Sequence, residues 1–500
     1  MMNWFSSTES RTRSRTCTKT YIPLQILSII ALGFFGWSNL DNIIRNQINS
    51  ELIVKTGGAL YHLWSEPPIH PVMKVYVFNV TNKDEWLAGQ GRVKLKLDEI
   101  GPLVYRETWW KTNVKMEEGG DVSYDLVKRF DPVPEKFGCD PNSLVILPNI
   151  PLFSGAARMK GQNELTVWAF QSAIEMFESK LFVSVPVKDI LWGYEEPLLV
   201  GATMVLPEEE IRKPGYFGLM AGRNMSSDGR ISVRGGFGSE GLSNLGGVTS
   251  WKERSEYTSW GSDECNSISG GEGSQFPPSI KPDTRLGIFI PDICRKLPLV
   301  FDKTETISGV ETLRFQPDPQ AFNYLAPENK CYCVSPANCT DNGVFYVSPC
   351  KYGAPLVVSW PHFLDAPQHA DKVEGLTPVE EKHRFYMNIQ PQMGMGLSAK
   401  VRLQINLDIM KAHEIPFFSS IPEDRLLVPI MWFEDSIDTP PENLLIILRD
   451  ALGLPDNLSN GFLTVCIGSV SIQLYTLIFL YIVLKPNLDD VMFGVEILSK

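Results

Sequence analysis

Two long stretches without charged residues lie near the ends of the chain. The first runs from Thr20 to Leu40 and the second from Asn457 to Val483, and both are mostly apolar. An α-helix needs about 20 residues to cross the hydrocarbon core of a bilayer, because it rises about 1.5 Å per residue. The pattern therefore predicts two membrane-spanning helices, over residues 21–40 and 461–484.

Basic residues in front of the first stretch set the predicted topology. They are Arg11, Arg13, Arg15 and Lys19. Positive charge that flanks a span is retained in the cytosol, so residues 1–20 and 485–500 are predicted to be cytosolic tails and residues 41–460 one ectodomain. A cleaved signal peptide is the alternative for the first stretch, because residues 36–38 fit a small-x-small cleavage site. In both cases the second stretch anchors the chain.

Between these stretches, apolar and polar residues alternate over short segments. From Lys400 to Leu407 the alternation is complete: the odd-numbered residues are apolar and the even-numbered residues are polar. Residues 93–97 alternate in the same way, and residues 75–80 form a third such run. A period of two is typical of antiparallel strands with one buried face. We therefore expect an ectodomain built mainly from antiparallel strands.

One segment of the ectodomain, residues 163–180, has the helical period instead. Its broad apolar surface lies beside a narrow polar stripe. That surface consists of Leu165, Val167, Trp168, Phe170, Ile174, Met176 and Phe177. Two interpretations remain open, a helix buried in the core or a hydrophobic helix at a point where lipids enter.

Charge and composition exclude some classes of protein. The 500 residues include 46 Lys and Arg against 58 Asp and Glu, which gives a formal net charge of −12. A nucleic-acid partner is not expected, because binding to phosphates needs a basic surface. The hydrophobic fraction of 43% and charged fraction of 21% are those of a folded chain, not a disordered one.

Six of the nine cysteines cluster in the predicted ectodomain. They are Cys265, Cys294, Cys331, Cys333, Cys339 and Cys350. An oxidising compartment favours three disulfides, with every pairing left open by the sequence. A zinc site is the rival interpretation, although the CxC pair lacks the usual knuckle spacing. Cys139 is then a buried free thiol, Cys466 packs within the second span, and Cys17 is either S-palmitoylated or a plain thiol.

Four N-glycosylation sequons lie in the predicted outside segment, which agrees with the topology. They begin at Asn79, Asn224, Asn338 and Asn457. Catalytic motifs are missing: the sequence has neither a GxSxG elbow nor an HExxH helix, and its six histidines are scattered. We therefore expect a protein that is not an enzyme and that has no cofactor and no metal site.

Several motifs resemble those of the class B scavenger receptor family, nearly end to end. They are VYVFNV at 75–80, GPLVYRE at 101–107, LWGYEEP at 191–197, FPP at 276–278, DICR at 292–295, CYC at 331–333, PHFL at 361–364 and GLTP at 375–378, which leads to His383. The spacing of the clustered cysteines is also similar to that of the family.

The resemblance implies an α+β fold. Its features would be a large antiparallel β-barrel-like ectodomain, a helical bundle at the apex distant from the membrane, an internal hydrophobic tunnel and two transmembrane helices. It also implies the disulfides Cys265–Cys331, Cys294–Cys350 and Cys333–Cys339.

Residues 152–182 match the apex that captures ligand in relatives. The candidate ligand-binding residues there are Arg158, Lys160, Trp168, Phe170, Phe177 and Lys180. Some relatives use basic apical residues for anionic lipoproteins. Here three glutamates of the same segment offset the basic residues, which is a departure from that pattern.

The function that the resemblance implies is a cell-surface scavenger-type receptor. It would capture lipidic ligands such as fatty acids, sterols, carotenoids or lipoprotein lipids and pass them through the tunnel to the membrane. Its partners would be lipids, lipoprotein particles and extracellular lipid-carrier proteins, and a homo-oligomer is left open. The alternative is a recognition or phagocytic receptor for microbial, apoptotic or protein ligands. The C-terminal tail has no acidic-dileucine signal, which favours the plasma membrane over an endosomal or lysosomal membrane.

Overall fold

The computed structural model describes residues 27–28, 30–31, 33–36, 39–40, 42–58, 61–202, 215–237, 241–333, 335 and 338–497. The chain divides into two compact units. The larger unit is Glu51–Leu445, and the smaller unit combines Met1–Ser50 with Ile446–Lys500.

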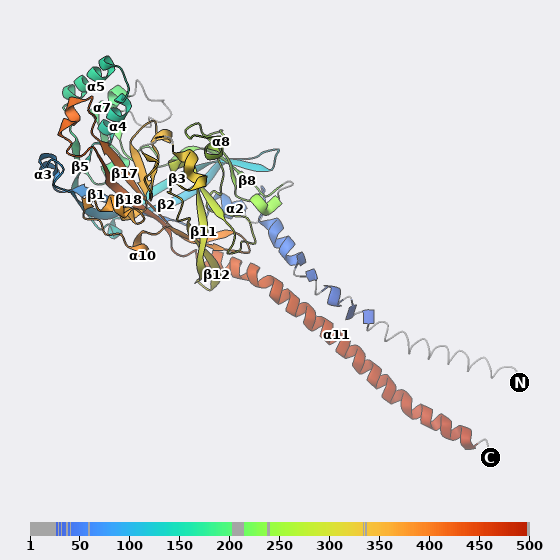
Figure 1. Ribbon diagram of the computed structural model, residues 1–500. Helices are drawn as coiled ribbons and strands as arrows, with labels where there is room; N and C mark the ends of the chain where they lie inside the picture. The colour runs from blue at the N-terminus through green and yellow to red at the C-terminus, as the bar shows by residue number, and fades with distance from the viewer. Residues whose placement is uncertain are drawn as a thin grey trace. The chain divides into compact units, whose positions relative to one another are not determined.

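The larger unit is built on one sheet whose described strands follow the order β10-β11-β12-β16-β17-β18-β1-β2-β3-β8-β9 (Figure 1). The strands of this path are β1 (Val72–Val80), β2 (Leu95–Met116), β3 (Asp121–Pro132), β8 (Ser226–Arg234), β9 (Val248–Trp251), β10 (Leu286–Ile290), β11 (Arg295–Ile307), β12 (Val310–Pro317), β16 (Tyr386–Gln390), β17 (Met395–Met410) and β18 (Arg425–Ile437). Every pair of neighbours along the path is antiparallel. Off the path lie β13 (Val344–Tyr346), β14 (Leu356–Ser359) and β15 (Val373–Glu374).

Residues 270–271 join the two ends of this path. The backbone N–H of Val248 in β9 donates to the carbonyl of Gly270 at 2.7 Å, and the N–H of Phe289 in β10 donates to the carbonyl of Gly271 at 2.9 Å. The sheet is therefore a nearly closed barrel, which removes most of its open edge. The predicted α+β class with an antiparallel barrel is confirmed, whereas the tunnel remains a prediction.

The strand register divides the barrel residues into two faces. Val75 of β1 lies opposite Phe433 of β18, and Phe433 lies opposite Leu403 of β17. Most strand residues on this face are buried or half-buried in the described part of the barrel, with exposed exceptions such as Thr304 and Glu311. The other face carries exposed charges such as Arg106 and Lys296. We call the first face the inner face and the second the outer face.

The expectation of a single buried face is wrong for β17. Its polar outer face is also buried: Arg402 is 4% exposed, and Gln404 and Asn406 are fully buried. The two amides are partnered, because Gln404 donates to the side-chain oxygen of Asn406 at 2.7 Å and Asn406 donates to Ser359 Oγ of β14 at 3.0 Å. Strand β14 pairs with the edge of β17, and the backbone N–H of His362 in the segment that follows donates to Gln404 Oε1 at 2.7 Å, so this segment lies against the outer face.

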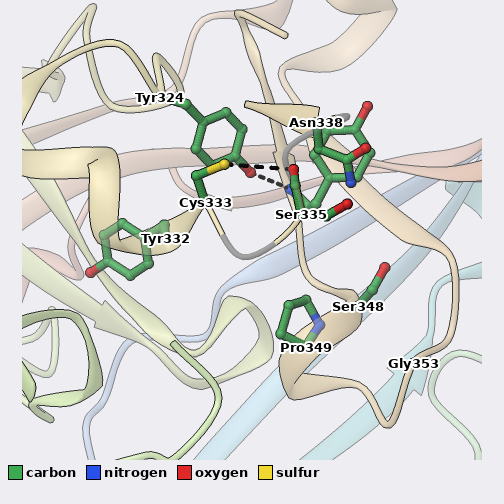
Figure 2. A pocket seen from close by; sticks show the side chains of 9 residues that line it. Tyr324, Tyr332, Cys333, Ser335, Asn338, Ser348, Pro349 and Gly353 are labelled. Carbon is green, nitrogen blue, oxygen red and sulfur yellow. Dashed lines mark hydrogen bonds between the residues drawn. The ribbon is translucent and has the colours of Figure 1, made fainter. Parts of the chain in front are cut away.

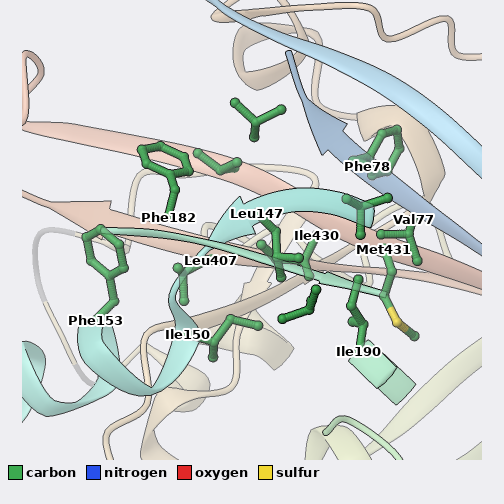
Figure 3. Close-up of a cluster of buried hydrophobic side chains, with 14 of the residues drawn as sticks. Val77, Phe78, Leu147, Ile150, Phe153, Phe182, Ile190, Leu407, Ile430 and Met431 are labelled. Carbon is green, nitrogen blue, oxygen red and sulfur yellow. The ribbon is translucent and has the colours of Figure 1, made fainter. Parts of the chain in front are cut away.

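Short helices and a second small sheet pack around Val77 and Met431 of the barrel. They are β4 (Leu144–Pro148), α4 (Ile150–Met159), α5 (Glu164–Met176), β5 (Phe182–Pro186), α6 (Asp189–Trp192) and α7 (Pro197–Ala202). Their apolar side chains gather with those of β1, β17 and β18 in one cluster (Figure 3). Asn149 and Asn163 cap α4 and α5, since their side chains accept the N–H groups of Leu152 and Thr166.

The other described short elements of the larger unit connect these parts. They are α2 (Tyr61–Ser65), α3 (Lys83–Ala88), β6 (Tyr194–Glu195), β7 (Tyr216–Phe217), α8 (Asp263–Asn266), α9 (Pro367–Ala370) and α10 (Glu380–His383). Three disulfides join Cys265 to Cys331, Cys294 to Cys350 and Cys333 to Cys339. These are the pairs that the family resemblance implies.

The smaller unit contains most of helix α11 (Glu442–Ile497). The part from Glu442 to Thr476 is long and apolar enough to cross a membrane, and it is the one such helix among the described residues. The described residues between 27 and 51 are helical. The other residues of the first predicted span lie outside the described residues, as does Cys17, which precedes the span. A Cβ atom added at Gly33 would lie 3.1 Å from Cys466 Sγ, so these two segments pack closely.

Candidate functional site

Helix α5 presents an apolar stripe to solvent. Leu165, Trp168 and Met176 are 73%, 66% and 75% exposed, and their spacing places them on one side of the helix. Ile174 is the one residue of α5 that is buried. The buried-core interpretation of this segment is therefore wrong. The helix also ends at Met176, before the predicted boundary.

The predicted apical aromatic residues have different surroundings. Trp168 belongs to the exposed stripe, and Phe177 directly after the helix is 39% exposed. Phe170 instead faces α4, where its ring would lie 2.6 Å from a Cβ atom added at Gly155. Phe170 and Gly155 therefore hold the two helices together. The sequence pattern could not separate Phe170 from the exposed residues, because it shows the period but not the neighbouring helix.

The predicted basic residues are not equivalent either. Lys160 and Lys180 are exposed, whereas Arg158 at the end of α4 is half-buried, and burial lowers the pKa of its guanidinium. Glu164 and Glu175 are exposed on α5. The described surface of α4 and α5 therefore has mixed charge around an apolar stripe, which suits a ligand held mainly by apolar contact.

A cavity of about 350 Å³ lies near the Cys333–Cys339 disulfide (Figure 2). Its lining includes the three tyrosines Tyr324, Tyr332 and Tyr346. It also includes Asn338, the acceptor of one predicted glycan. The hydroxyl of Tyr324 accepts the backbone N–H of Tyr346 at 2.9 Å, which fixes one wall.

The other predicted glycan acceptors also have defined places. Asn79 lies in β1, and its side-chain oxygen accepts the N–H of Ile146 at 2.8 Å. Asn224 is exposed, and its oxygen accepts the N–H of Phe130 at 3.0 Å. Asn457 lies within helix α11. Asn79 and Asn224 use their side-chain oxygens in these hydrogen bonds. A glycan would be attached to the side-chain nitrogen, which neither bond uses.

Two buried histidines and a partly exposed glutamate form a group on the outer face. His362 Nε2 lies 2.6 Å from Glu99 Oε2, and Trp432 Nε1 donates to the same oxygen at 2.7 Å. Because His362 Nδ1 accepts the N–H of Thr377, its Nε2 carries the proton and donates to Glu99. Burial acts to raise the pKa of Glu99, but the hydrogen bonds from His362 and Trp432 outweigh it, so the net shift is downward.

The second histidine of this group stacks on the first. The ring centres of His362 and His383 are 4.3 Å apart and the rings are nearly parallel. Burial, and then the neighbouring charge of His362, lower the pKa of His383 to about 4. The sequence places His383 only after the GLTP motif. It does not show that His362, which lies 21 residues earlier, stacks on it.

A charged group also lies on the inner face, where apolar residues are expected. Glu107 of β2, Lys128 of β3 and Asp435 of β18 share this face. Lys128 Nζ lies 3.5 Å from Glu107 Oε2. No signal in the sequence separates these residues from the solvent-exposed charges of the same strands, because only the register with neighbouring strands places them inside.

Comparison with known proteins identifies the family. A family model described as the CD36 family matches residues 24–481. The chain belongs to the CD36 family. Scavenger receptor class B member 1 of Rattus norvegicus is 30% identical over 420 residues, which cover 83% of this chain and 80% of the relative. Lysosome membrane protein 2 of Mus musculus is 30% identical over 430 residues, which cover 85% of this chain and 86% of the relative.

CD36 family membership confirms the resemblance to class B scavenger receptors. The corresponding receptor of Bos taurus is 29% identical over 430 residues, 85% of this chain and 82% of its own length. These relatives are consistent with a scavenger-type receptor. Two of these relatives are named as scavenger receptors, whereas the third is named for the lysosome membrane.

Proposed function

We propose that this CD36 family protein is a non-enzymatic receptor that captures lipidic ligands at α5 and passes them along the barrel interior to the membrane. The exposed stripe of Leu165, Trp168 and Met176 carries the proposal. Aromatic and thioether side chains exposed together favour a hydrophobic ligand, because solvent-exposed apolar patches mark interaction sites.

The inner face of the barrel supports the transfer step. Val401, Ile405 and Phe433 lie on this face and are only half-buried, although the strand residues around them, such as Leu403 and Met431, are buried. Their remaining accessible surface supports an internal conduit. Each CH₂ group removed from water contributes about 0.8 kcal/mol, so a sheltered apolar path lowers the barrier to transfer without an energy source.

The location proposed with this function is the plasma membrane, with both termini in the cytosol and residues 41–460 outside. Residues 21–40 and 461–484 would be the two anchors. The mature ectodomain would carry glycans at the predicted sequons. An endosomal or lysosomal membrane is the second location, supported by the similarity to lysosome membrane protein 2.

A recognition receptor for protein or particle ligands is the second candidate function. The observation that favours it is the exposure of three glutamates in the same segment, Glu164, Glu175 and Glu178. Mixed polar and apolar surfaces are typical of transient protein interfaces.

Lipid uptake by cells that express the full chain tests the first function. Replacing Leu165, Trp168 and Met176 by Ser should reduce uptake about tenfold, since aromatic anchors dominate binding energy. The matched control is Leu325→Ser, which removes another leucine that is 69% exposed. Equal surface levels exclude misfolding. The opposite outcome has two parts: expressing cells take up no more lipid than untransfected cells, and they bind particles only when Leu165, Trp168 and Met176 are intact. That outcome would establish the recognition receptor instead.

A further inference from the structure

Three charged residues of the inner face, Glu107, Lys128 and Asp435, lie on strands that are close to one another. Asp435 of β18 lies opposite Met73 of β1, which lies opposite Tyr105 of β2. Two residues beyond Tyr105 is Glu107, whose neighbour on the same face, Trp109, lies opposite Lys128 of β3. The three charged side chains therefore belong to one region of the barrel interior.

The positive charge in this region is already neutralised. Besides its contact with Glu107 at 3.5 Å, Lys128 Nζ lies 4.3 Å from the centre of the Trp109 ring. Trp109 Nε1 in turn donates to Glu107 Oε2 at 2.6 Å. The ammonium group thus has a carboxylate and an aromatic face as partners, and the carboxylate has two donors.

Asp435 has no comparable partners. Its side chain makes no hydrogen bond or ion pair with any residue that the structure describes, and it is half-buried. Burial and the nearby charge of Glu107 raise the pKa of Asp435 to about 7. A carboxyl group in this state can accept a hydrogen bond when ionised and donate one when protonated.

Other charges near Lys128 do not supply a free cation. Asp228 and Asp292 both interact electrostatically with Lys128. Asp292 is bonded to Arg223, whose Nη1 and Nη2 donate to it at 3.1 and 2.5 Å, and Lys351 Nζ lies 3.9 Å from it. Lys111, two residues beyond Trp109 on the same face, has its Nζ 3.8 Å from Glu272. Each of these cations therefore already faces a carboxylate.

We infer that Asp435, together with the Lys128–Glu107 pair, selects lipids whose polar end is an uncharged hydroxyl and rejects those that end in a carboxylate. This inference rests on the proposed lipid transfer and names its substrate class. A hydroxyl can donate to Asp435 or accept a proton from it. A fatty-acid carboxylate would be desolvated beside two carboxyl groups without an unpaired cation, which is unfavourable.

Binding to the purified full chain in nanodiscs tests the inference separately from transfer. The probes are cholesterol, which has one hydroxyl, and oleate, which has one carboxylate. The wild type should bind cholesterol about tenfold more tightly than oleate at pH 7.4, and Asp435→Asn should reduce that ratio about tenfold by removing a negative charge. The matched control is Asp84→Asn, because the side chain of Asp84 is 87% exposed in helix α3.

The outcomes separate the two proposals. Equal affinity of the wild type for both lipids, binding of neither lipid, or a ratio that Asp435→Asn leaves unchanged would overturn the inference. Selective binding without uptake by expressing cells would contradict the transfer function and leave the inference standing. An unchanged melting temperature of Asp435→Asn shows that the variant is folded.

Discussion

Two successive residues of β18, Glu434 and Asp435, place carboxyl groups on opposite faces of the barrel with different surroundings. On the outer face, Arg402 donates to Glu434 from Nε at 2.8 Å and from Nη2 at 2.5 Å, and Lys74 also donates to Glu434 at 2.7 Å. On the inner face, Asp435, the next residue of the same strand, has no such bond among the described residues. Neighbouring carboxyl groups therefore differ completely in their partners.

This difference indicates a structural role for Glu434 and is the basis of the binding role proposed for Asp435. Buried ionic groups are tolerated when every donor and acceptor is satisfied, and Arg402 meets that condition through further bonds to the carbonyls of Glu381 and Arg384. A carboxyl group without protein partners reduces stability unless a ligand or water bonds to it. The outer network therefore stabilises the fold, whereas no described residue satisfies the hydrogen-bonding capacity of the Asp435 carboxyl group.

The largest expected effect is on the outer face. Arg402→Met should lower the free energy of unfolding by about 3–5 kcal/mol, because Glu434 would remain buried with fewer donors. Denaturant unfolding of the full chain in detergent, followed by tryptophan fluorescence, measures it. The matched control is Lys400→Met on the same face, whose Nζ lies 3.9 Å from Glu434 and whose side chain is 25% exposed. That control should lose less than about 1 kcal/mol, and equal losses would contradict the role of Arg402.

A smaller effect should appear when pH changes the outer histidine pair. The pKa of His383 is about 4 in the folded protein, below the usual value of about 6.5, so the unfolded chain binds the proton more tightly. Its contribution to stability is complete above about pH 6.5 and declines as the pH falls toward 4. We expect a loss of about 2 kcal/mol over that interval.

The melting temperature measured from pH 7 to pH 4 checks this expectation. His362, Glu99, Arg402 and Lys382 are the charged or titratable groups that act on His383. His383→Gln keeps an acceptor for the N–H of Val379, which His383 Nδ1 accepts at 3.0 Å. The variant should melt with a weaker dependence on pH. A wild-type melting temperature that is constant over this interval would be incompatible with the assigned pKa.

The fold class could be predicted from the sequence because it depends on local periodicity and on motifs. The alternation from Lys400 to Leu407 correctly predicted β17. Its second buried face could not be predicted, because the covering segment with Ser359 lies far away in the chain and is brought there by pairing of β14 with β17. Local pattern reports which residues share a face, but not what lies against it.

The candidate site shows the same limit. The sequence located the apolar segment around Trp168 but could not separate Phe170, which packs against Gly155, from exposed Leu165 and Met176. The sequence did not predict the charged residues of the inner face. Asp435 and Lys128 come together only through the register of the barrel strands. Long-range pairing, not composition, produces this site.

The smallest effect is expected for Asp435 itself, and its sign is opposite to that of Arg402. Because burial and then Glu107 raise its pKa to about 7, above an ordinary value of about 3.9, ionised Asp435 destabilises the fold above pH 7. Asp435→Asn should therefore stabilise the full chain by about 1 kcal/mol at pH 8, an estimate reduced for the side chain's partial exposure to solvent. The gain should disappear near pH 3, where Asp435 is largely protonated in both the folded and the unfolded wild-type chain. Denaturant unfolding at the two pH values measures the difference, and a loss of stability at pH 8 would show that Asp435 has a protein partner and belongs with the outer network.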